Sequence, residues 1–106
     1  MGLLTYFKSP DIDSGMTEWQ STPGAILLDV RTRSEYRSGH IPGSVNLPLQ
    51  DIDSAENVIS DKSTPIFVYC QSGARSASAS NGLRRIGYSV VKNIGGLNRY
   101  SGNLER

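Results

Sequence analysis

The chain has 106 residues, of which 37% are hydrophobic and 20% are charged. These values fit one globular domain with a modest core, so we expect a single domain over residues 1–106. Eleven basic and ten acidic side chains give a net charge of +1, with no basic stripe and no acidic tail. This balance argues against binding to nucleic acid or to an anionic membrane surface.

The sequence has no long apolar segment and one cysteine, Cys70. No apolar run approaches the roughly 20 residues that span a bilayer, and residues 1–8 lack the regions of a signal peptide. One cysteine cannot form an internal disulfide, so no oxidised framework is implied. We therefore expect a cytoplasmic protein with no membrane contact, and a monomer because no exposed apolar stripe stands out.

The hydrophobic pattern predicts helices and strands that alternate along the chain. Apolar residues share one face in the helical segments, as Ile12, Met16 and Trp19 do in the first of them. The run 25–30 is apolar except for Asp29, as in strands that are buried on both faces of a parallel sheet. In chain order we expect a helix at 11–20, a strand at 25–30, a helical turn at 34–38, a strand at 44–47, a helix at 49–59, a strand at 65–69, a helix at 76–86 and a strand at 88–94, followed by a turn at 95–96.

This alternation predicts an α/β architecture with a mostly parallel central sheet flanked by helices on both faces. In open parallel sheets, ligands bind outside the carboxyl ends of the strands. Asp29 and Cys70 both lie at such ends. We therefore expect them at the same rim of the sheet.

Cys70 lies between a predicted strand and a helix, joined by a short loop. Backbone N–H groups converge at such a place and the helix dipole is positive there, which favours thiolate over thiol. The competing interpretation is a small buried side chain at a strand end. The loop favours the functional interpretation, since its residues are small and polar: Gln71, Ser72, Gly73, Ala74, Arg75 and Ser76.

Small residues allow consecutive loop amides to turn inward and form an anion-binding nest. Gly73 permits a positive φ, Arg75 supplies a fixed cation, and Ser76 is placed to cap the following helix. Four residues separate Cys70 from Arg75. A cysteine-dependent phosphatase needs a roomier cradle for a tetrahedral phosphate, whereas this tighter loop suits one additional sulfur atom.

Two sequence motifs of this chain resemble those of the single-domain rhodaneses, a family of sulfurtransferases. The loop 70–76 matches the form C-x-x-G-x-R-S, and residues 29–31 followed by 35–46 resemble the second motif of the family. The pair Gly95-Gly96 also fits the pattern of the family, and the resemblance extends from about residue 16 to residue 102. Ser44 stands where alanine is usual, and Tyr100 lies near a position that often holds tryptophan.

The resemblance implies a rhodanese-like fold and sulfur transfer in two steps. Cys70 would attack the sulfane sulfur of a donor such as thiosulfate, release sulfite and carry the sulfur as a persulfide. A thiol, or cyanide in the test tube, would then accept it. The amides of residues 71–76 would hold the persulfide, Arg75 would attract the anionic donor and anchor the loop, and no metal or organic cofactor is needed. Without a second cysteine, an external thiol or a thioredoxin-like or sulfur-relay protein must be the acceptor.

Other polar residues near this rim are predicted to have structural roles. Asp29 would accept hydrogen bonds that fix the loops, since sulfur transfer needs little proton movement. Arg31 and Glu35, four positions apart, could pair across one helical turn. His40, the single histidine, is interpreted as a turn residue bonded to the backbone rather than a general base. Trp19 is expected to anchor the first helix to the core.

Two other functions compete with an active sulfurtransferase. A persulfide carrier or sulfur-relay module with little small-molecule turnover would have the same loop, because it also needs a reactive cysteine. A phosphatase or arsenate reductase on a similar scaffold would need a longer loop. The sulfur donor stays open among thiosulfate, mercaptopyruvate, glutathione persulfide and a cysteine desulfurase.

Overall fold

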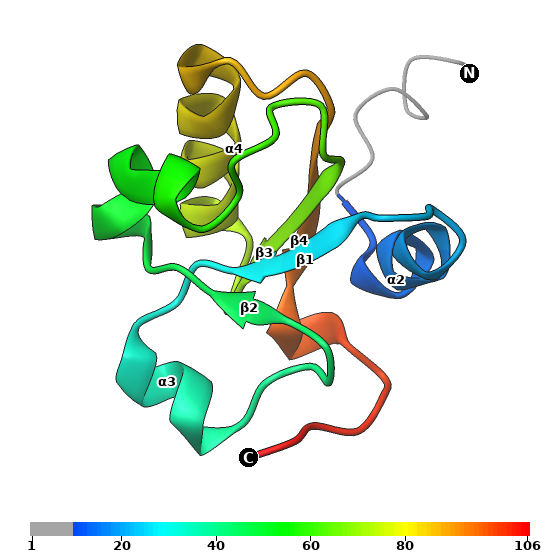
Figure 1. Cartoon of the computed structure of the whole chain (residues 1–106). Helices are drawn as coiled ribbons and strands as arrows, with labels where there is room; N and C mark the ends of the chain where they lie inside the picture. Colours follow the sequence, from blue (N-terminus) through cyan, green and yellow to red (C-terminus); the bar gives the residue numbers. More distant parts are fainter. Residues whose placement is uncertain (1–9) are drawn as a thin grey trace, which may run out of the picture.

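The computed structural model describes residues 10–106, and the N-terminal region in which no signal peptide is expected lies outside the described residues. Four parallel strands form one sheet in the order β2-β1-β3-β4 (Figure 1). The predicted parallel α/β sheet is therefore confirmed. The strands are β1 (Ile26–Asp29), β2 (Val45–Asn46), β3 (Ile66–Cys70) and β4 (Val91–Gly96).

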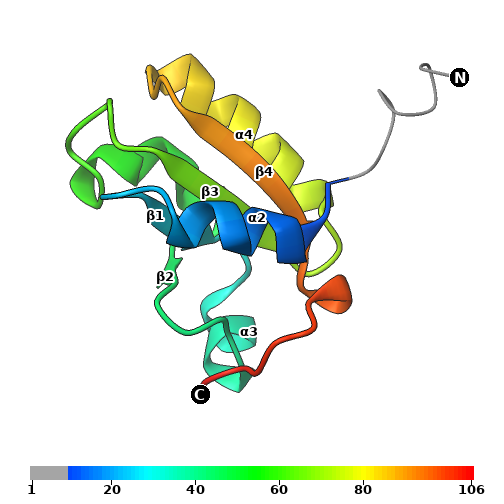
Figure 2. The ribbon, with the colours of Figure 1, turned by 90° about the vertical axis from the view of Figure 1, so that its right-hand side faces the viewer.

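Helices cover both faces of the sheet, as expected. Figure 2 shows α2 (Ile12–Gln20) on one face, with α4 (Ala74–Ile86) and the 3₁₀ helix η1 (Leu49–Asn57) behind the strands on the other face. Two short helices, α3 (Arg33–Ser38) and η2 (Leu97–Arg99), lie beyond the carboxyl ends of the strands. Among residues 10–106, no helix is long and apolar enough to cross a bilayer.

The central strand β3 is buried on both faces, which explains its unbroken apolar sequence. Ile66, Val68 and Cys70 pack in the core beneath α4 and η1. Phe67 and Tyr69 point to the other face and pack against α2. Cys70 is thus fixed by a strand that has no exposed face.

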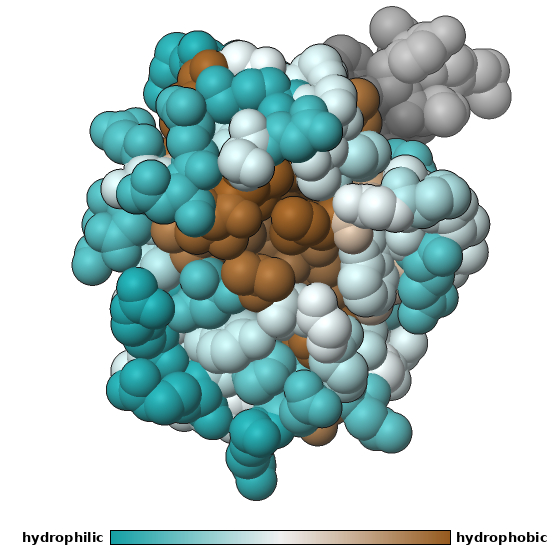
Figure 3. Space-filling view, in the orientation of Figure 1, coloured by the Kyte–Doolittle hydropathy of each residue, from teal (hydrophilic) through white to brown (hydrophobic). Residues whose placement is uncertain are grey.

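One edge of β1 is only half covered, because β2 pairs with Leu28 and Asp29 and with no earlier residue of β1. Apolar residues gather over β1 at the centre of the face shown in Figure 3, with polar residues around them. Ile26 on this edge is accordingly only partly buried. The short β2 therefore leaves apolar surface near the sheet edge.

The helix expected at 49–59 is a 3₁₀ helix that ends at Asn57. Leu49, Ile52 and Ala55 recur at every third position, which is the period of a 3₁₀ helix rather than an α-helix. All three pack into the core beneath α4. The apolar face was predicted, but the type of helix was wrong.

The last strand begins at Val91, three positions later than predicted, and it includes Gly95 and Gly96. Tyr88, expected in the strand, is instead buried in the core after the end of α4, where its hydroxyl donates to the carbonyl of Ile59. The two glycines, expected to form a turn, instead pair with Tyr69 and Cys70. This later register brings the end of β4 alongside the cysteine.

Candidate functional site

Cys70 is the last residue of β3, at the carboxyl edge of the sheet, and its side chain is 0% exposed. The chain leaves the strand through Gln71 and Ser72 and enters α4 at Ala74. Gly73 makes this tight connection with a φ of 105°, a left-handed conformation that glycine tolerates. The expected positive φ at Gly73 is therefore confirmed.

Two polar groups of the loop and of α4 contact the sulfur. The N–H of Gly73 donates to Cys70 Sγ at 3.0 Å, and Sγ lies 3.5 Å from the hydroxyl oxygen of Ser76. The prediction that Ser76 caps α4 is wrong, because the helix starts two residues before it and Gly73 is the N-cap. Ser76 lies in the first turn, where its buried hydroxyl faces the sulfur instead of solvent.

The surroundings of the thiol favour its ionised form. Burial raises the pKa of Cys70, because a charge is poorly solvated there. The hydroxyl and the N–H of Ser76 act in the opposite direction, and the N–H groups of Gly73 and Ser72 add to them. Their combined effect exceeds that of burial, so the pKa of Cys70 lies below its ordinary value.

Asn93 orients the Ser76 hydroxyl, a role that sequence reasoning missed. The Ser76 hydroxyl oxygen lies 2.7 Å from Asn93 Oδ1, 2.9 Å from the carbonyl oxygen of Gly73 and 3.5 Å from Cys70 Sγ, and its single proton serves one of these acceptors at a time. The N–H of Gly95 donates to the same Asn93 oxygen at 3.0 Å, which fixes the amide. No sequence pattern links Ser76 to Asn93, because adjacent elements α4 and β4 bring them together.

Gly96 allows the cysteine loop to pack directly on β4. A Cβ at this position would lie 2.6 Å from the carbonyl oxygen of Gln71 and 2.7 Å from the carbonyl carbon of Ser72. The N–H of Asn98 donates to the same Gln71 oxygen at 3.1 Å. The loop is thus held on its outer side by the backbone of β4 and η2.

Arg75 is tied to Glu35 of α3 by two hydrogen bonds, of 2.7 and 3.0 Å. The Arg75 guanidinium holds the pKa of Glu35 at about 2, so the pair stays ionised in neutral solution. Glu35 also accepts from the N–H of Thr32, completing a capping box at the start of α3. The expected pair of Glu35 with Arg31 is wrong, since Arg75 occupies the carboxylate.

Arg31 instead pairs with Asp29 in the interior. Its Nε and Nη2 atoms donate to the carboxylate at distances of 2.7–3.1 Å, and its backbone N–H donates at 2.9 Å. Arg31 Nη2 also donates to the carbonyl of Gly39 at 2.7 Å. Asp29 is 0% exposed and Arg31 is 3% exposed. The expected role of Asp29 as a hydrogen-bond acceptor that fixes the rim fits this arrangement.

His40 lies in the turn after α3. Its Nδ1 is 2.8 Å from the carbonyl oxygen of Tyr36, and the two rings stack with their centres 3.7 Å apart. Its backbone forms a bridge with Glu105. These contacts are those of a turn residue bonded to the backbone, as expected, and they connect it to α3 and the C-terminal segment.

Gln71, Ser72 and Ala74 have exposed side chains, so they shape the loop through their backbone atoms. Trp19 is partly buried against the core on the α2 face, where its Nε1 donates to the carbonyl of Ala25 at 3.1 Å. Among the described residues, no three His, Cys, Asp or Glu side chains are grouped to hold a metal ion.

Replacing Ser76 with alanine should raise the pKa of Cys70, because a donor to the thiolate is lost while burial stays. The profile of thiol alkylation against pH should shift to higher pH. At a pH below both midpoints, the alkylation rate should fall about tenfold, the size expected for a hydrogen bond to a charged group. Ser78→Ala, on the exposed side of α4, is the control and should leave the profile unchanged. An unshifted profile in Ser76→Ala would remove its hydroxyl from this role.

Known proteins resemble this chain in sequence and in fold. The rhodanese-like domain family matches residues 13–103. Thiosulfate sulfurtransferase PspE of Escherichia coli is 35% identical over 71 residues, covering 66% of this chain and 68% of PspE. The putative sulfur carrier protein YrkF of Bacillus subtilis is 34% identical over 80 residues, covering 74% of this chain and 43% of YrkF.

A solved structure described as "rhodanese with anions from E. coli" superimposes with a TM-score of 0.71 at 30% identity, covering 77% of this chain and 98% of that one. The family match spans most of the chain, and the fold agrees with it. The chain therefore belongs to the rhodanese-like family of sulfurtransferases.

Proposed function

We propose that the protein transfers a sulfane sulfur from a donor such as thiosulfate to a thiol acceptor, through a persulfide on Cys70. The observation that carries the proposal is the pair of polar groups at the buried Sγ: the Gly73 N–H donates to it at 3.0 Å, and the Ser76 hydroxyl oxygen lies 3.5 Å from it. These dipoles are fixed by the fold before any reaction takes place. They would stabilise a negative sulfur in both the resting and the loaded protein.

In the first step, the Cys70 thiolate attacks the outer sulfur of thiosulfate. A sulfur–sulfur bond forms with Cys70, the bond to the sulfite sulfur breaks, and its electron pair leaves with sulfite. In the second step, an acceptor thiolate attacks the outer sulfur of the persulfide, and Cys70 departs as thiolate. The cycle needs no net oxidant or reductant, and it is a ping-pong reaction with one covalent intermediate.

Arg75 has a mainly anchoring role in this proposal. Its guanidinium is committed to Glu35, which offsets much of the positive charge that was expected to attract the donor. The two hydrogen bonds instead connect the first turn of α4 to α3. The thiolate would therefore depend on backbone and hydroxyl dipoles more than on a free cation.

A persulfide carrier with little small-molecule turnover is the second candidate. The similarity to the sulfur carrier YrkF favours it, although the chain spans less than half of that protein. The full burial of Cys70 also fits a carrier, because an enclosed persulfide is shielded from small thiols. The two candidates differ in how fast the loaded sulfur leaves.

Intact-protein mass spectrometry after brief incubation with thiosulfate tests the proposal. We expect a gain of one sulfur atom in the native chain, lost on addition of cyanide or a thiol, and no gain in Cys70→Ser. Rapid loss to small acceptors supports the enzyme, whereas a persulfide that survives them supports the carrier. No gain with thiosulfate or with an organic persulfide would contradict sulfur transfer at Cys70.

A further inference from the structure

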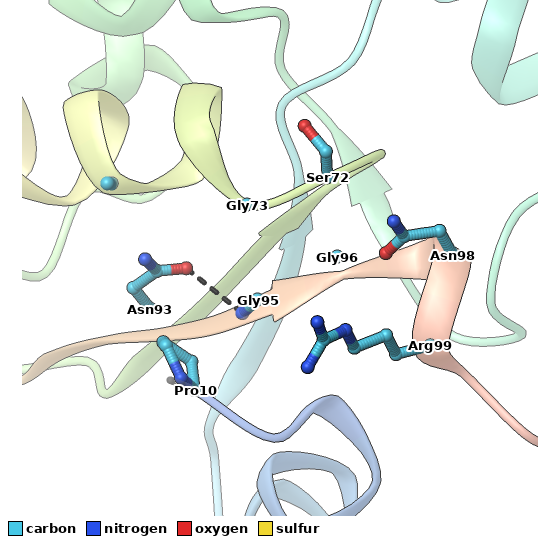
Figure 4. Close-up of a pocket in the computed structure, with 9 residues that line it drawn as sticks. Pro10, Ser72, Gly73, Asn93, Gly95, Gly96, Asn98 and Arg99 are labelled. Atoms are coloured by element: carbon cyan, nitrogen blue, oxygen red, sulfur yellow. Dashed lines mark hydrogen bonds between the residues drawn. The ribbon is translucent and has the colours of Figure 1, made fainter. Parts of the chain in front are cut away.

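A cavity of about 330 Å³ lies beside the cysteine loop, at the β4 edge of the sheet (Figure 4). Ser72 and Gly73 of the loop form one side of it, Asn93 of β4 another, and Asn98 and Arg99 of η2 a third. This volume is at the lower end of the range for sites that bind small organic molecules. It is far larger than one sulfur atom on Cys70 requires.

The lining of the cavity is rich in hydrogen-bond donors. Figure 4 shows the Arg99 side chain extending from η2 along β4, and the Asn98 amide near Gly96 and Ser72. Within residues 10–106, Arg99 forms no ion pair and no side-chain hydrogen bond, and no aspartate or glutamate lines the cavity. Such a lining suits an anionic group, and the planar guanidinium suits a carboxylate in particular.

Asn93 adds a donor to this lining. Its Oδ1 is engaged by the Ser76 hydroxyl and by the Gly95 N–H, which leaves the Nδ2 group as its free end. In the described part of the chain, Nδ2 has no hydrogen-bond partner. A bound acceptor atom would therefore meet a fixed amide donor as well as a mobile cation.

The cavity shares Gly73 with the surroundings of the reacting sulfur. Gly73, which lines it, is the residue whose N–H donates to Cys70 Sγ at 3.0 Å. A Cβ on Gly73 would lie only 3.7 Å from the Cα of Gly95, so the wall here is backbone without side chains. Cys70 itself does not line the cavity, so Gly73 is the residue that connects a ligand held there to the sulfur.

We propose that this cavity binds the carboxylate end of a small organic thiol that accepts the sulfur from Cys70, with Arg99 contacting the carboxylate. This inference rests on the proposed sulfur transfer. The volume exceeds what thiosulfate, with five heavy atoms, requires, so the cavity also has room for a thiol that carries a carboxylate. Arg99 is thus assigned to the choice of acceptor and not to the formation of the persulfide.

The test compares two acceptors, 3-mercaptopropionate and 2-mercaptoethanol, on preloaded persulfide protein. Arg99→Gln should lower the rate constant for discharge by 3-mercaptopropionate at subsaturating concentration about tenfold, the effect of one charged hydrogen bond, and leave 2-mercaptoethanol unchanged. Comparing native and variant protein for each thiol cancels the difference in thiol reactivity. Arg85→Gln, an exposed arginine at the far end of α4, removes the same charge and should have no effect.

Measuring the loading and the discharge of Cys70 separately shows whether the cavity binds the sulfur donor or the sulfur acceptor. If Arg99→Gln slows loading by an anionic donor and not discharge, the cavity belongs to the donor and the acceptor assignment is overturned. The assignment would also be overturned if the ratio of the rate constants for the two thiols were the same in Arg99→Gln as in Arg85→Gln.

A second readout does not depend on sulfur transfer. The backbone amide NMR signals of Gly96 and Asn98 should show saturable shifts with 3-(methylthio)propionate, and these shifts should be lost in Arg99→Gln. Absence of such shifts in the native chain would refute the site even if the persulfide forms.

Discussion

Replacing Cys70 with serine should lower sulfur-transfer turnover at least about 10³-fold, the range found when a covalent nucleophile is removed. A serine hydroxyl stays protonated at neutral pH and cannot carry a persulfide. The change keeps nearly the same shape, and serine can still accept from the Gly73 N–H that now donates to the sulfur. The measurement is sulfite release from thiosulfate with cyanide as the acceptor.

Two controls make this result specific to the sulfur. The thermal unfolding midpoint of Cys70→Ser should stay close to that of the native chain, which separates lost chemistry from a lost fold. Initial rates of the native chain at several acceptor concentrations should give the parallel double-reciprocal lines of a ping-pong reaction. Turnover within tenfold of the native value in folded Cys70→Ser would mean that the sulfur passes through another group.

Replacing Asp29 with alanine should lower the free energy of unfolding by about 3–5 kcal/mol, the cost of leaving a buried charge without its partner. Among residues 10–106, the Gly39 carbonyl would be the one hydrogen-bond partner left to the Arg31 guanidinium. Denaturant unfolding of this 106-residue chain, followed to completion and fitted as a two-state transition, gives the value.

An exposed ion pair supplies the matched comparison. Glu18 and Lys92 are each about half exposed, so Glu18→Ala should change stability by no more than about 1 kcal/mol. The double variant Asp29→Ala with Arg31→Met should be more stable than Asp29→Ala alone, because it no longer buries an unpaired cation. Equal losses in Asp29→Ala and Glu18→Ala would show that the buried pair does not hold the rim together.

Secondary structure near the site was predicted correctly where the local sequence pattern agrees with the tertiary structure. The apolar run that ends at Cys70 predicted a strand, and β3 is a strand whose five residues are all buried. The small loop and Gly73 predicted a tight connection to a helix. The pair Gly95-Gly96 misled, because glycines usually indicate a turn, whereas here they continue a strand that needs close approach to the loop.

The contacts that complete the site join distant parts of the chain. Arg75 and Glu35 are 40 residues apart, and Ser76 and Asn93 are 17 apart, so no periodicity relates either pair. Glu35 could be assigned to Arg31 from spacing alone, since four positions is the ordinary distance for a helical pair. One local signal was available, since Thr32 and Glu35 have the spacing of a capping box and thus indicate where α3 begins.

The enclosure of Cys70 has a consequence for the behaviour of the protein in air. A disulfide between two copies would require their Cα atoms to come within about 4.4–6.8 Å of each other. Each Cys70 is the last residue of a buried central strand with no exposed side-chain surface, so two such strands cannot meet while both chains are folded. A protein with one reactive sulfur is thereby protected from oxidative cross-linking to itself, and its covalent dimerisation would report unfolding.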